Sequence, residues 1–200
     1  MCQEKRSESV VVACDDGVVD KRRQRAGVVA CVLWARGPVD VEASTAPLDI
    51  QESSSLIAGL ALALASRSGL RPRAILLDSL TILGFSVVSP PALRRLSGAP
   101  LVAVYKYKPR VENLEAALKK HFPDWRLRLS VLRVLERVER VETRRGELYI
   151  LPWGLSLEEA SALVAELQEY SRTPEPLRLA HSIASELSKL ALMRGSDRSF

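Results

Sequence analysis

The chain has 200 residues, 47% hydrophobic and 26% charged, which is enough for one globular domain with a substantial core. The uncharged stretch from Ser53 to Ser66 is too short and too rich in Ser and Ala to span a bilayer, and the polar N-terminus is unlike a signal peptide, so we expect a cytoplasmic protein. The net charge of +5 favours an anionic partner, although a GC-rich genome or a thermophilic source explains it equally well.

The first quarter of the chain predicts three antiparallel strands. Val10–Cys14 is a β-branched run that ends in an acidic turn, and Gly27–Trp34 is a second apolar run. A third, more polar strand begins at Val39–Ala43. The basic turn Lys21–Arg25 between the first two strands is either a solvated hairpin tip or a contact to a phosphate backbone.

The hydrophobic period then changes, and helices alternate with strands. Glu52–Arg67 is predicted to be a helix with a Ser-rich start and a face of small residues. The elements that follow are a buried strand at Ala74–Leu77, a brief helix near Leu93, a strand at Leu101–Tyr105 and a helix over Val111–Phe122.

The last third contains one ambiguous segment. Leu127–Val141 fits either a strand or a charged helix. Ser156 and Glu159 form the sequence pattern of a capping box at the start of a helix over Leu157–Tyr170. The other expected elements are a strand at Leu148–Leu151 and a final helix over Pro174–Met193.

This order of elements predicts an α/β fold with one mixed sheet and flanking helices. We expect a single domain over 1–200, with disordered tails at about 1–8 and 195–200. The first strand should lie beside Ala74–Leu77 and parallel to it. That pair marks a topological switch point, where open α/β sheets bind ligands beyond the carboxyl ends of their strands.

Two aspartates follow these expected neighbours. Asp15 and Asp78 each come directly after a strand, so their carboxylates can share a Mg²⁺ or Mn²⁺ ion. The alternative is that both only cap strand ends and accept hydrogen bonds from loop amides. Asp16 points to the opposite face and is expected to hold the Gly17 turn.

A third acid would complete a metal site. Asp49 and Glu52 lie just before the first helix and are the candidates for it. A carboxylate there is also explained by the helix dipole alone.

The string from Pro174 to His181 is the most distinctive part of the chain. Glu175, Arg178 and His181 are spaced by three, so they lie along one side of a helix, where an ion pair can orient the imidazole. His181 is a candidate for proton transfer or metal binding, and Arg178 for a phosphate contact. A purely structural histidine is the alternative.

The chain has three cysteines. An odd number without metal-ligand spacing argues against a secreted disulfide scaffold or a zinc site. Cys14 and Cys31 fall on strands that should be neighbours. We expect buried thiols there, and a cross-strand disulfide is the less favoured alternative.

Five strings in order make the chain resemble an archaeal family of uncharacterised proteins, domain of unknown function 99, which is itself similar to endonuclease V. The resemblance runs roughly from Val10 to Leu187. The strings are CDDG at 14–17, ILLD at 75–78, GF at 84–85, GLSLEEA at 154–160 and PEPLRLAH at 174–181.

The resemblance implies a ribonuclease H-like fold and a Mg²⁺-dependent nuclease activity. In endonuclease V, acidic residues bind Mg²⁺ and the enzyme cuts near a deaminated purine. The positions similar to its acids are Asp15, Glu52 and Asp78, and its histidine is similar to His181.

Some positions depart from the family pattern. Ser79 stands where a Gly is usual, Ser86 where an Asn is usual and Ser89 where an Asp is expected. The proline–tyrosine wedge with which endonuclease V opens a duplex is absent around Pro47, which argues against recognition of hypoxanthine.

The leading hypothesis is a Mg²⁺- or Mn²⁺-dependent nuclease or phosphodiesterase acting on DNA or RNA. The second is a catalytically inactive nucleic-acid-binding protein of the same fold, which tight, salt-sensitive binding without metal dependence would favour. The third is a protein-interaction domain whose basic charge is incidental, which failure to bind nucleic acid would favour.

Overall fold

The computed structural model describes residues 9–17, 26–48 and 53–196. Seven strands form one sheet in the order β3-β2-β1-β4-β7-β9-β8, and β5 and β6 pair as a small separate hairpin. The strands are β1 (Val11–Asp16), β2 (Ala26–Trp34), β3 (Pro38–Pro47), β4 (Ala74–Leu77), β5 (Thr81–Ile82), β6 (Ser86–Val87), β7 (Leu101–Tyr105), β8 (Glu139–Thr143) and β9 (Gly146–Trp153).

The sheet is mixed, as predicted. β1 lies parallel to β4, with Cys14 opposite Leu77, and β4 lies parallel to β7. β2 and β3 continue the sheet antiparallel on one side, and β9 and β8 on the other. The carboxyl ends of β1, β4 and β7 therefore meet at one edge of the sheet, which is the expected switch point.

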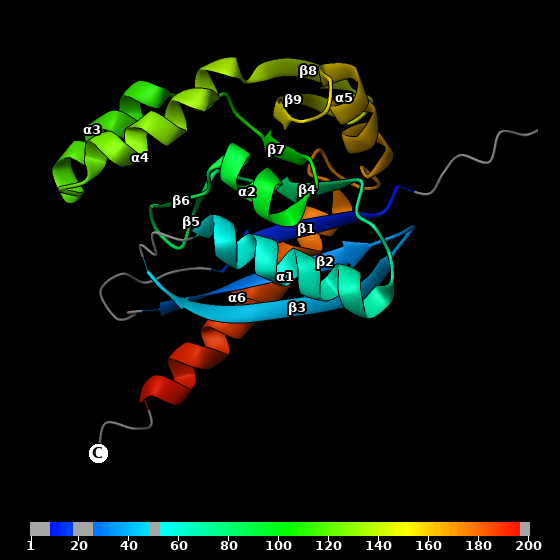
Figure 1. Cartoon of the computed structure of the whole chain (residues 1–200), viewed down its shortest axis with the longest axis horizontal. Coiled ribbons are helices and arrows are strands. Elements are labelled where there is room, and N and C mark those ends of the chain that lie inside the picture. The colour runs from blue at the N-terminus through cyan, green and yellow to red at the C-terminus, as the bar shows by residue number, and fades with distance from the viewer. Residues whose placement is uncertain (1–8, 18–25, 49–52, 197–200) are drawn as a thin grey trace, which may run out of the picture.

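Helices cover both faces of the sheet, and Figure 1 shows α1 in front of strands β1–β3 and α6 behind them. The first face is covered by α1, α2, the α3–α4 hairpin and the 3₁₀ helix η1, and the second by α5 and α6. The helices are α1 (Ser53–Ser68), α2 (Pro90–Ser97), α3 (Val111–His121), α4 (Trp125–Leu132), η1 (Arg133–Arg137), α5 (Leu157–Glu166) and α6 (Glu175–Ser196).

β1 is apolar on both sides because helices cover it on both sides. Val12 and Cys14 belong to the core under α1, and Val11 and Ala13 to the core on the α5 face. All four are completely buried. Side chains alternate along a strand, so the next residue, Asp15, is directed to the α6 side.

The ambiguous segment divides into three elements. Its first part is helical, as α4 and η1, and only its end forms strand β8. Leu129, Leu132 and Leu135 are buried at a spacing of three, which places them on one side of a helix. The expected helix over Leu157–Tyr170 is shorter than predicted, ending at Glu166, and its capping box is present.

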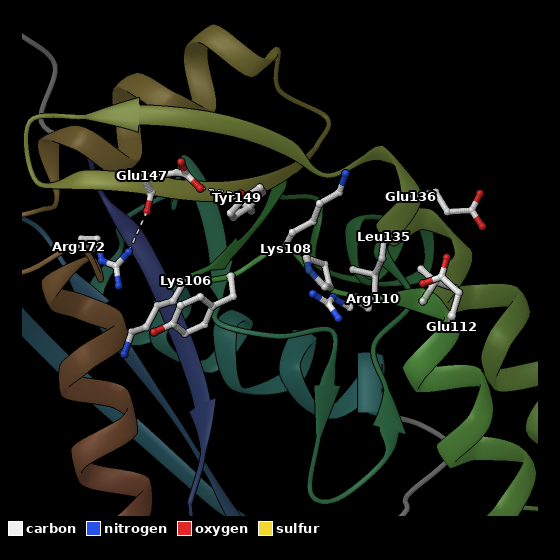
Figure 2. Close-up of a pocket in the computed structure, with 12 residues that line it drawn as sticks. Lys106, Lys108, Arg110, Glu112, Leu135, Glu136, Glu147, Tyr149 and Arg172 are labelled. Carbon is white, nitrogen blue, oxygen red and sulfur yellow. Dashed lines mark hydrogen bonds between the residues drawn. The ribbon is translucent and has the colours of Figure 1, made fainter.

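α3 and α4 form a helical hairpin at one end of the molecule, which Figure 1 shows in green. A hollow of about 980 Å³ opens between the β7–α3 connection, η1 and β9, and we call it the β7–α3 hollow. Figure 2 shows the side chains that line it. They include Lys106, Tyr107, Lys108, Arg110, Glu112, Glu136, Glu147, Tyr149 and Arg172.

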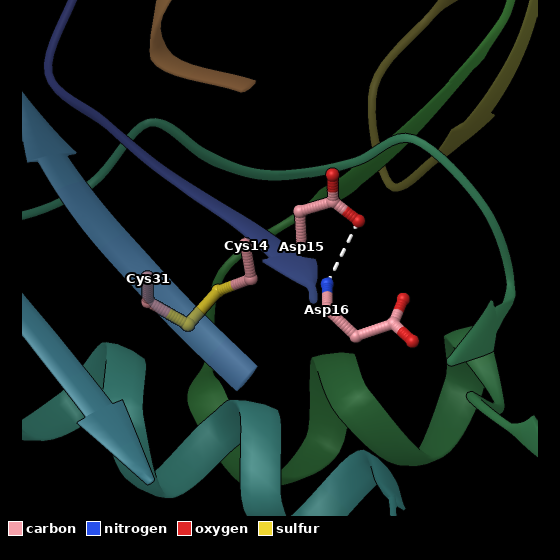
Figure 3. The surroundings of a disulfide bond; sticks show 4 residues. All are labelled: Cys14, Asp15, Asp16 and Cys31. Atoms are coloured by element: carbon pink, nitrogen blue, oxygen red, sulfur yellow. Dashed lines mark hydrogen bonds between the residues drawn. A yellow bond between two sulfur atoms is a disulfide. The ribbon is translucent and has the colours of Figure 1, made fainter. Parts of the chain in front are cut away.

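Cys14 and Cys31 form a disulfide, which corrects the expectation of buried thiols. They are directly opposite in the β1–β2 pair, with their Cα atoms 4.1 Å apart. Figure 3 shows the bond next to Asp15 and Asp16. The strand assignments were correct, but the choice between thiols and disulfide depended on the exact register, which the sequence pattern does not fix.

Several predicted features lie outside the described residues. They are the N-terminal tail, the basic turn Lys21–Arg25, Asp49 and Glu52. At the other end, α6 continues to Ser196, and residues 197–200 lie outside the described residues. In the described ranges, no helix combines the length and apolar composition needed to cross a lipid bilayer.

Candidate active site

Asp15, the second-last residue of β1, has a buried carboxyl group held from two sides. Its Oδ1 accepts a 2.8 Å hydrogen bond from the backbone N–H of Asp16. Its Oδ2 lies 2.8 Å from Nδ1 of His181 on α6. The Asp15 side chain is only 4% exposed, whereas that of His181 is 58% exposed. The sheet and α6 together therefore fix the orientation of this carboxyl group.

Asp78 follows β4 at the same edge. The parallel register, with Cys14 opposite Leu77, places Asp78 beside Asp15, close enough for the two charges to interact. Unlike Asp15, Asp78 is exposed to solvent. Both line a pocket of about 460 Å³, which we call the Asp15 pocket. Its other polar lining residues are Lys106, Tyr107, Thr173, Arg178, His181 and Ser182.

The two acids repel each other when both are ionised. Burial raises the pKa of Asp15 far above its ordinary value, and the neighbouring charge of Asp78 raises it further. The pKa of Asp78 is also raised by burial of its carboxyl group, although Asp15, His181 and Lys106 act in the opposite direction. We assign the raised pKa chiefly to Asp15, because Asp78 remains open to water.

A divalent cation is the group that this arrangement accommodates. Mg²⁺ and Mn²⁺ prefer oxygen ligands, and Mg²⁺ is commonly held by one or two carboxylates together with water and substrate phosphates. Asp15 and Asp78 fit that donor set. Within the described ranges, no group of three or more His, Cys, Asp or Glu side chains is arranged around one metal position. Glu52, the third expected ligand, precedes α1 outside those ranges.

Glu175, Arg178 and His181 all lie on α6, as predicted. Arg178 Nε donates a 3.0 Å hydrogen bond to Glu175 Oε2, and Glu175 is almost buried. Arg178 is exposed and lines the Asp15 pocket together with His181. The imidazole is oriented by Asp15, however, rather than by the Glu175–Arg178 ion pair.

Asp16 points to the other face of the sheet, as predicted, but it holds a different turn. Its Oδ2 accepts a 2.7 Å hydrogen bond from the backbone N–H of Leu83, in the β5–β6 turn. Leu83 has a φ of 48°, a left-handed conformation that is unfavourable for leucine. Burial raises the pKa of Asp16 to about 6, although the Leu83 bond opposes this.

Gly17 completes the CDDG string with a steric role. A Cβ atom on Gly17 would lie 2.3 Å from the backbone oxygen of Ala184 and 2.1 Å from Oγ of Ser188, both on α6. Only glycine lets α6 approach β1 this closely. The same helix carries His181, so Gly17 helps to set the distance between His181 and Asp15.

Lys106 and Tyr107 are among the lining residues that the sequence argument missed. Lys106 and Tyr107 follow β7, the third of the parallel strands, and line both the Asp15 pocket and the β7–α3 hollow. Their position directly after a predicted strand was visible in the sequence. What was not visible was that β7 would be the next neighbour of β4 and parallel to it.

Sequence relatives span nearly the whole chain. A UPF0215 protein of Aeropyrum pernix is 42% identical over 184 residues, covering 89% of this chain and 97% of the relative. A UPF0215 protein of Pyrococcus furiosus is 30% identical over 200 residues, covering 98% of each.

Solved structures share the fold. A protein of unknown function from Archaeoglobus fulgidus superposes with a TM-score of 0.77 at 22% identity, covering 89% of this chain and 97% of that one. Endonuclease V of Ciona intestinalis, in complex with a 24mer DNA containing an inosine followed by a ribo-adenosine, superposes with a TM-score of 0.57 at 16% identity. That match covers 94% of this chain and 87% of the endonuclease.

The likeness to endonuclease V confirms the predicted ribonuclease H-like fold. At such low sequence identity, the likeness concerns the fold and not the activity. The family model described as Endonuclease dU matches residues 7–188, almost the whole of the sequence. With this match and the UPF0215 relatives, the chain belongs to the endonuclease dU family.

Proposed function

We propose that this protein is a metal-dependent endonuclease that hydrolyses a phosphodiester bond of DNA or RNA. The observation that carries the proposal is that Asp15 and Asp78 lie side by side at the switch point of the sheet and line one pocket. A pair of neighbouring carboxylates, one of them buried as Asp15 is, is costly unless a proton or a cation neutralises it. An open pocket beside the pair leaves room for a substrate phosphate.

Each residue has a distinct role in this proposal. Asp15, Asp78 and Glu52 hold Mg²⁺ or Mn²⁺, which when bound lowers the pKa of water and stabilises the leaving oxygen. His181 keeps Asp15 oriented through Nδ1, which leaves Nε2 to accept or donate a proton in the pocket. Arg178 contacts the substrate phosphate, since a guanidinium group forms charge-assisted hydrogen bonds to phosphate oxygens.

The family description makes deoxyuridine in DNA the first substrate to test. Uracil in DNA arises by deamination of cytosine, and a nuclease of this kind would start its repair. The DNA in the Ciona endonuclease V complex contains inosine, another deaminated base, which makes inosine the second substrate to test.

The test compares cleavage of end-labelled oligonucleotides, single- and double-stranded, with one deoxyuridine, one deoxyinosine or neither, and matched RNA strands. With Mg²⁺ or Mn²⁺ we expect cleavage by the wild-type protein and none in EDTA. Asp15→Asn, Asp78→Asn and Glu52→Gln should each lower the rate by more than about 100-fold, since even residues that only position metal ligands cost about 10- to 100-fold.

Asp40→Asn is the matched control. Asp40 is an aspartate on β3 that pairs with Arg67, outside the Asp15 pocket, so its loss should leave cleavage unchanged. If the Asp78→Asn variant cleaves at the wild-type rate, the proposed role of the acid pair is rejected.

The second candidate is a nucleic-acid-binding protein without catalysis. The departures at Ser79, Ser86 and Ser89 favour it, because serine stands at the positions where the resembled family usually has Gly, Asn and Asp. Salt-sensitive binding by the wild-type protein, with no cleavage of any of these strands in either metal, would support this candidate over the endonuclease.

A further inference from the structure

One long segment of this protein carries an excess of positive charge equal to that of the whole chain. Lys106–Arg137 contains nine Lys and Arg residues and four Asp and Glu residues, a difference of +5. The net charge of the whole chain is also +5, so basic and acidic residues balance in the rest of it. The segment comprises the β7–α3 connection, the α3–α4 hairpin and η1.

This segment forms one wall of the β7–α3 hollow, which adjoins the Asp15 pocket. Lys106 and Tyr107 line both, so the two are neighbouring parts of one surface. The hollow, at about 980 Å³, has roughly twice the volume of the Asp15 pocket, at about 460 Å³. A polymer bound at the acid pair can therefore continue into it, whereas a small substrate would need only the pocket.

The cations of the hollow face solvent. Lys106, Lys108 and Arg110 are exposed, and none of them has an ion-pair partner among the residues that the structure describes. Of the acids, Glu147 is neutralised by Arg140 at 2.5 Å. Figure 2 shows Glu112 and Glu136 at one end, beside α3 and η1. Lys106 and Arg172 lie at the opposite end, near α6, with Lys108 and Arg110 between the two groups.

Tyr107 gives the hollow an aromatic surface. It is 75% exposed, and the Arg172 guanidinium lies 5.9 Å from its ring centroid. Arg172 is held in place, because its side chain lies over Gly146 and its Nη1 donates to the Glu147 carbonyl oxygen at 3.4 Å. Exposed aromatic rings and arginine planes among basic residues are the features on which nucleic-acid bases stack.

The α3–α4 hairpin is fixed to the rest of the molecule. Arg128 Nη1 donates a 2.6 Å hydrogen bond to the Phe85 carbonyl oxygen, and its guanidinium lies 4.3 Å from the Phe122 ring centroid. Leu118, Leu129 and Leu132 are buried beneath the hairpin. The basic wall is therefore held in position, and it does not need to fold when a ligand binds.

We infer that the β7–α3 hollow binds a single-stranded stretch of nucleic acid next to the cleaved bond, with a base stacked on Tyr107 and phosphates contacting Lys108 and Arg110. The inference rests on the proposed function for the position of the cleaved bond. A single strand fits better than a duplex, because a base paired inside a duplex cannot present its face to Tyr107.

The first experiment measures binding in EDTA, where no cleavage occurs. Fluorescence anisotropy compares labelled single strands with the same sequence as a duplex, at several salt concentrations. Tyr107→Ala should weaken single-strand binding by about 5- to 150-fold, the range for loss of one stacked base. The double variant Lys108→Gln/Arg110→Gln should lower the slope of log affinity against log salt by about 1.4, since each single-strand phosphate contact contributes about 0.7.

A second measurement locates the stacked base. 2-Aminopurine is placed at successive positions on either side of a deoxyuridine, and its fluorescence should fall on binding at positions on one side only. Tyr107→Ala should abolish that change. Quenching on neither side, or equal affinity for duplex and single strand, would overturn the inference.

Tyr170→Ala is the matched control for Tyr107→Ala, because Tyr170 is a tyrosine of similar exposure (79%) that does not line the hollow. Arg71→Gln/Lys189→Gln is the matched control for the charge variant. If the wild-type protein cleaves but the hollow variants bind and cleave like these controls, the inference fails and the endonuclease proposal stands. If the hollow variants lose binding but the wild-type protein never cleaves, the catalytic proposal fails alone.

Discussion

Asp15 lies near the end of β1, and the strand residues before it, Val11 to Cys14, have no exposed surface. At this position an ionised carboxylate has little water around it and Asp78 beside it. His181 and the Asp16 amide offset part of this cost through hydrogen bonds. A carboxyl group kept in such surroundings destabilises the fold when it ionises, which is common for residues that act in catalysis rather than in folding.

The raised pKa of Asp15 predicts a pH-dependent stability in metal-free buffer. A carboxyl group whose pKa is higher in the folded than in the unfolded chain stabilises the fold fully below the unfolded pKa, near 3.8, and this contribution is lost as the pH rises through the folded pKa. Asp15→Asn should therefore become more stable relative to wild type as the pH rises from about 4 to about 8. Chemical denaturation at several pH values measures this.

Asp40→Asn provides a control of opposite sign. Arg67 lowers the pKa of Asp40, so that aspartate stabilises the fold above its ordinary pKa, and the contribution is lost as the pH falls through the lowered pKa. Carbon-13 NMR titration of the Asp15 carboxyl group tests the cause directly. A midpoint near 4 for Asp15 would contradict the prediction.

At the scale of elements, the position of α6 against β1 decides the geometry of the site. α6 brings His181 to Asp15 and Arg178 to the same pocket. The close approach depends on the missing side chain of Gly17, whose neighbours on α6 include backbone atoms that cannot rotate away. The contact is therefore rigid.

Gly17→Ala should destabilise the protein by about 1–3 kcal/mol, because its methyl group overlaps the α6 backbone. It should also displace His181 from Asp15, which a change in the NMR shifts of the imidazole would report. Gly59→Ala is the matched control. Gly59 lies within α1, with no atom within 4 Å of an added Cβ, so alanine there should stabilise by about 0.5–1 kcal/mol. Equal effects of the two substitutions, measured by denaturation, would refute the steric explanation.

At the scale of the whole molecule, the acid pair and the basic segment occupy distinct but neighbouring parts of the surface. The acid pair lies at the switch edge of the sheet, and the basic segment Lys106–Arg137 begins at the same edge, directly after β7. In the proposed function, the basic segment attracts an anionic polymer and brings it to the acid pair, where a cation would remove the repulsion between carboxylates and phosphate. The distribution of charge thus supports the proposed substrate more strongly than the net value of +5 does.

A divalent ion that binds the folded chain but not the unfolded chain should raise the stability of the fold. At a free Mn²⁺ concentration about 100 times the dissociation constant, the gain is about 2.7 kcal/mol, which corresponds to a Tm higher by about 5–11 °C for a domain of this size. Differential scanning fluorimetry with and without Mn²⁺ measures it.

Asp15→Asn and Asp78→Asn should abolish this gain, whereas Asp40→Asn should keep it, since Asp40 pairs with Arg67 away from the pocket. A Tm gain that survives both pocket variants would show that Mn²⁺ binds elsewhere. This test needs no substrate, so its result is independent of the cleavage assays.

The sequence by itself determined the local elements and the positions of the acids along them. β-branched runs, capping residues and helical spacing predicted most strands and helices, and the alternation along β1 correctly separated Asp15 from Asp16. The parallel pairing of β1 with β4 followed from the order of elements, because few topologies connect them. The string around His181 was placed on its helix for the same local reasons.

Only the tertiary structure decided which distant side chains meet. The disulfide required Cys14 and Cys31 to be directly opposite, and a shift of one residue in register would have prevented it. Likewise, the partner of Asp16 is Leu83, and the β7–α3 hollow combines Tyr107 with Arg172 from the far end of the chain. Local patterns record the period of a segment, but such contacts depend on how separate segments pack, which no single segment encodes.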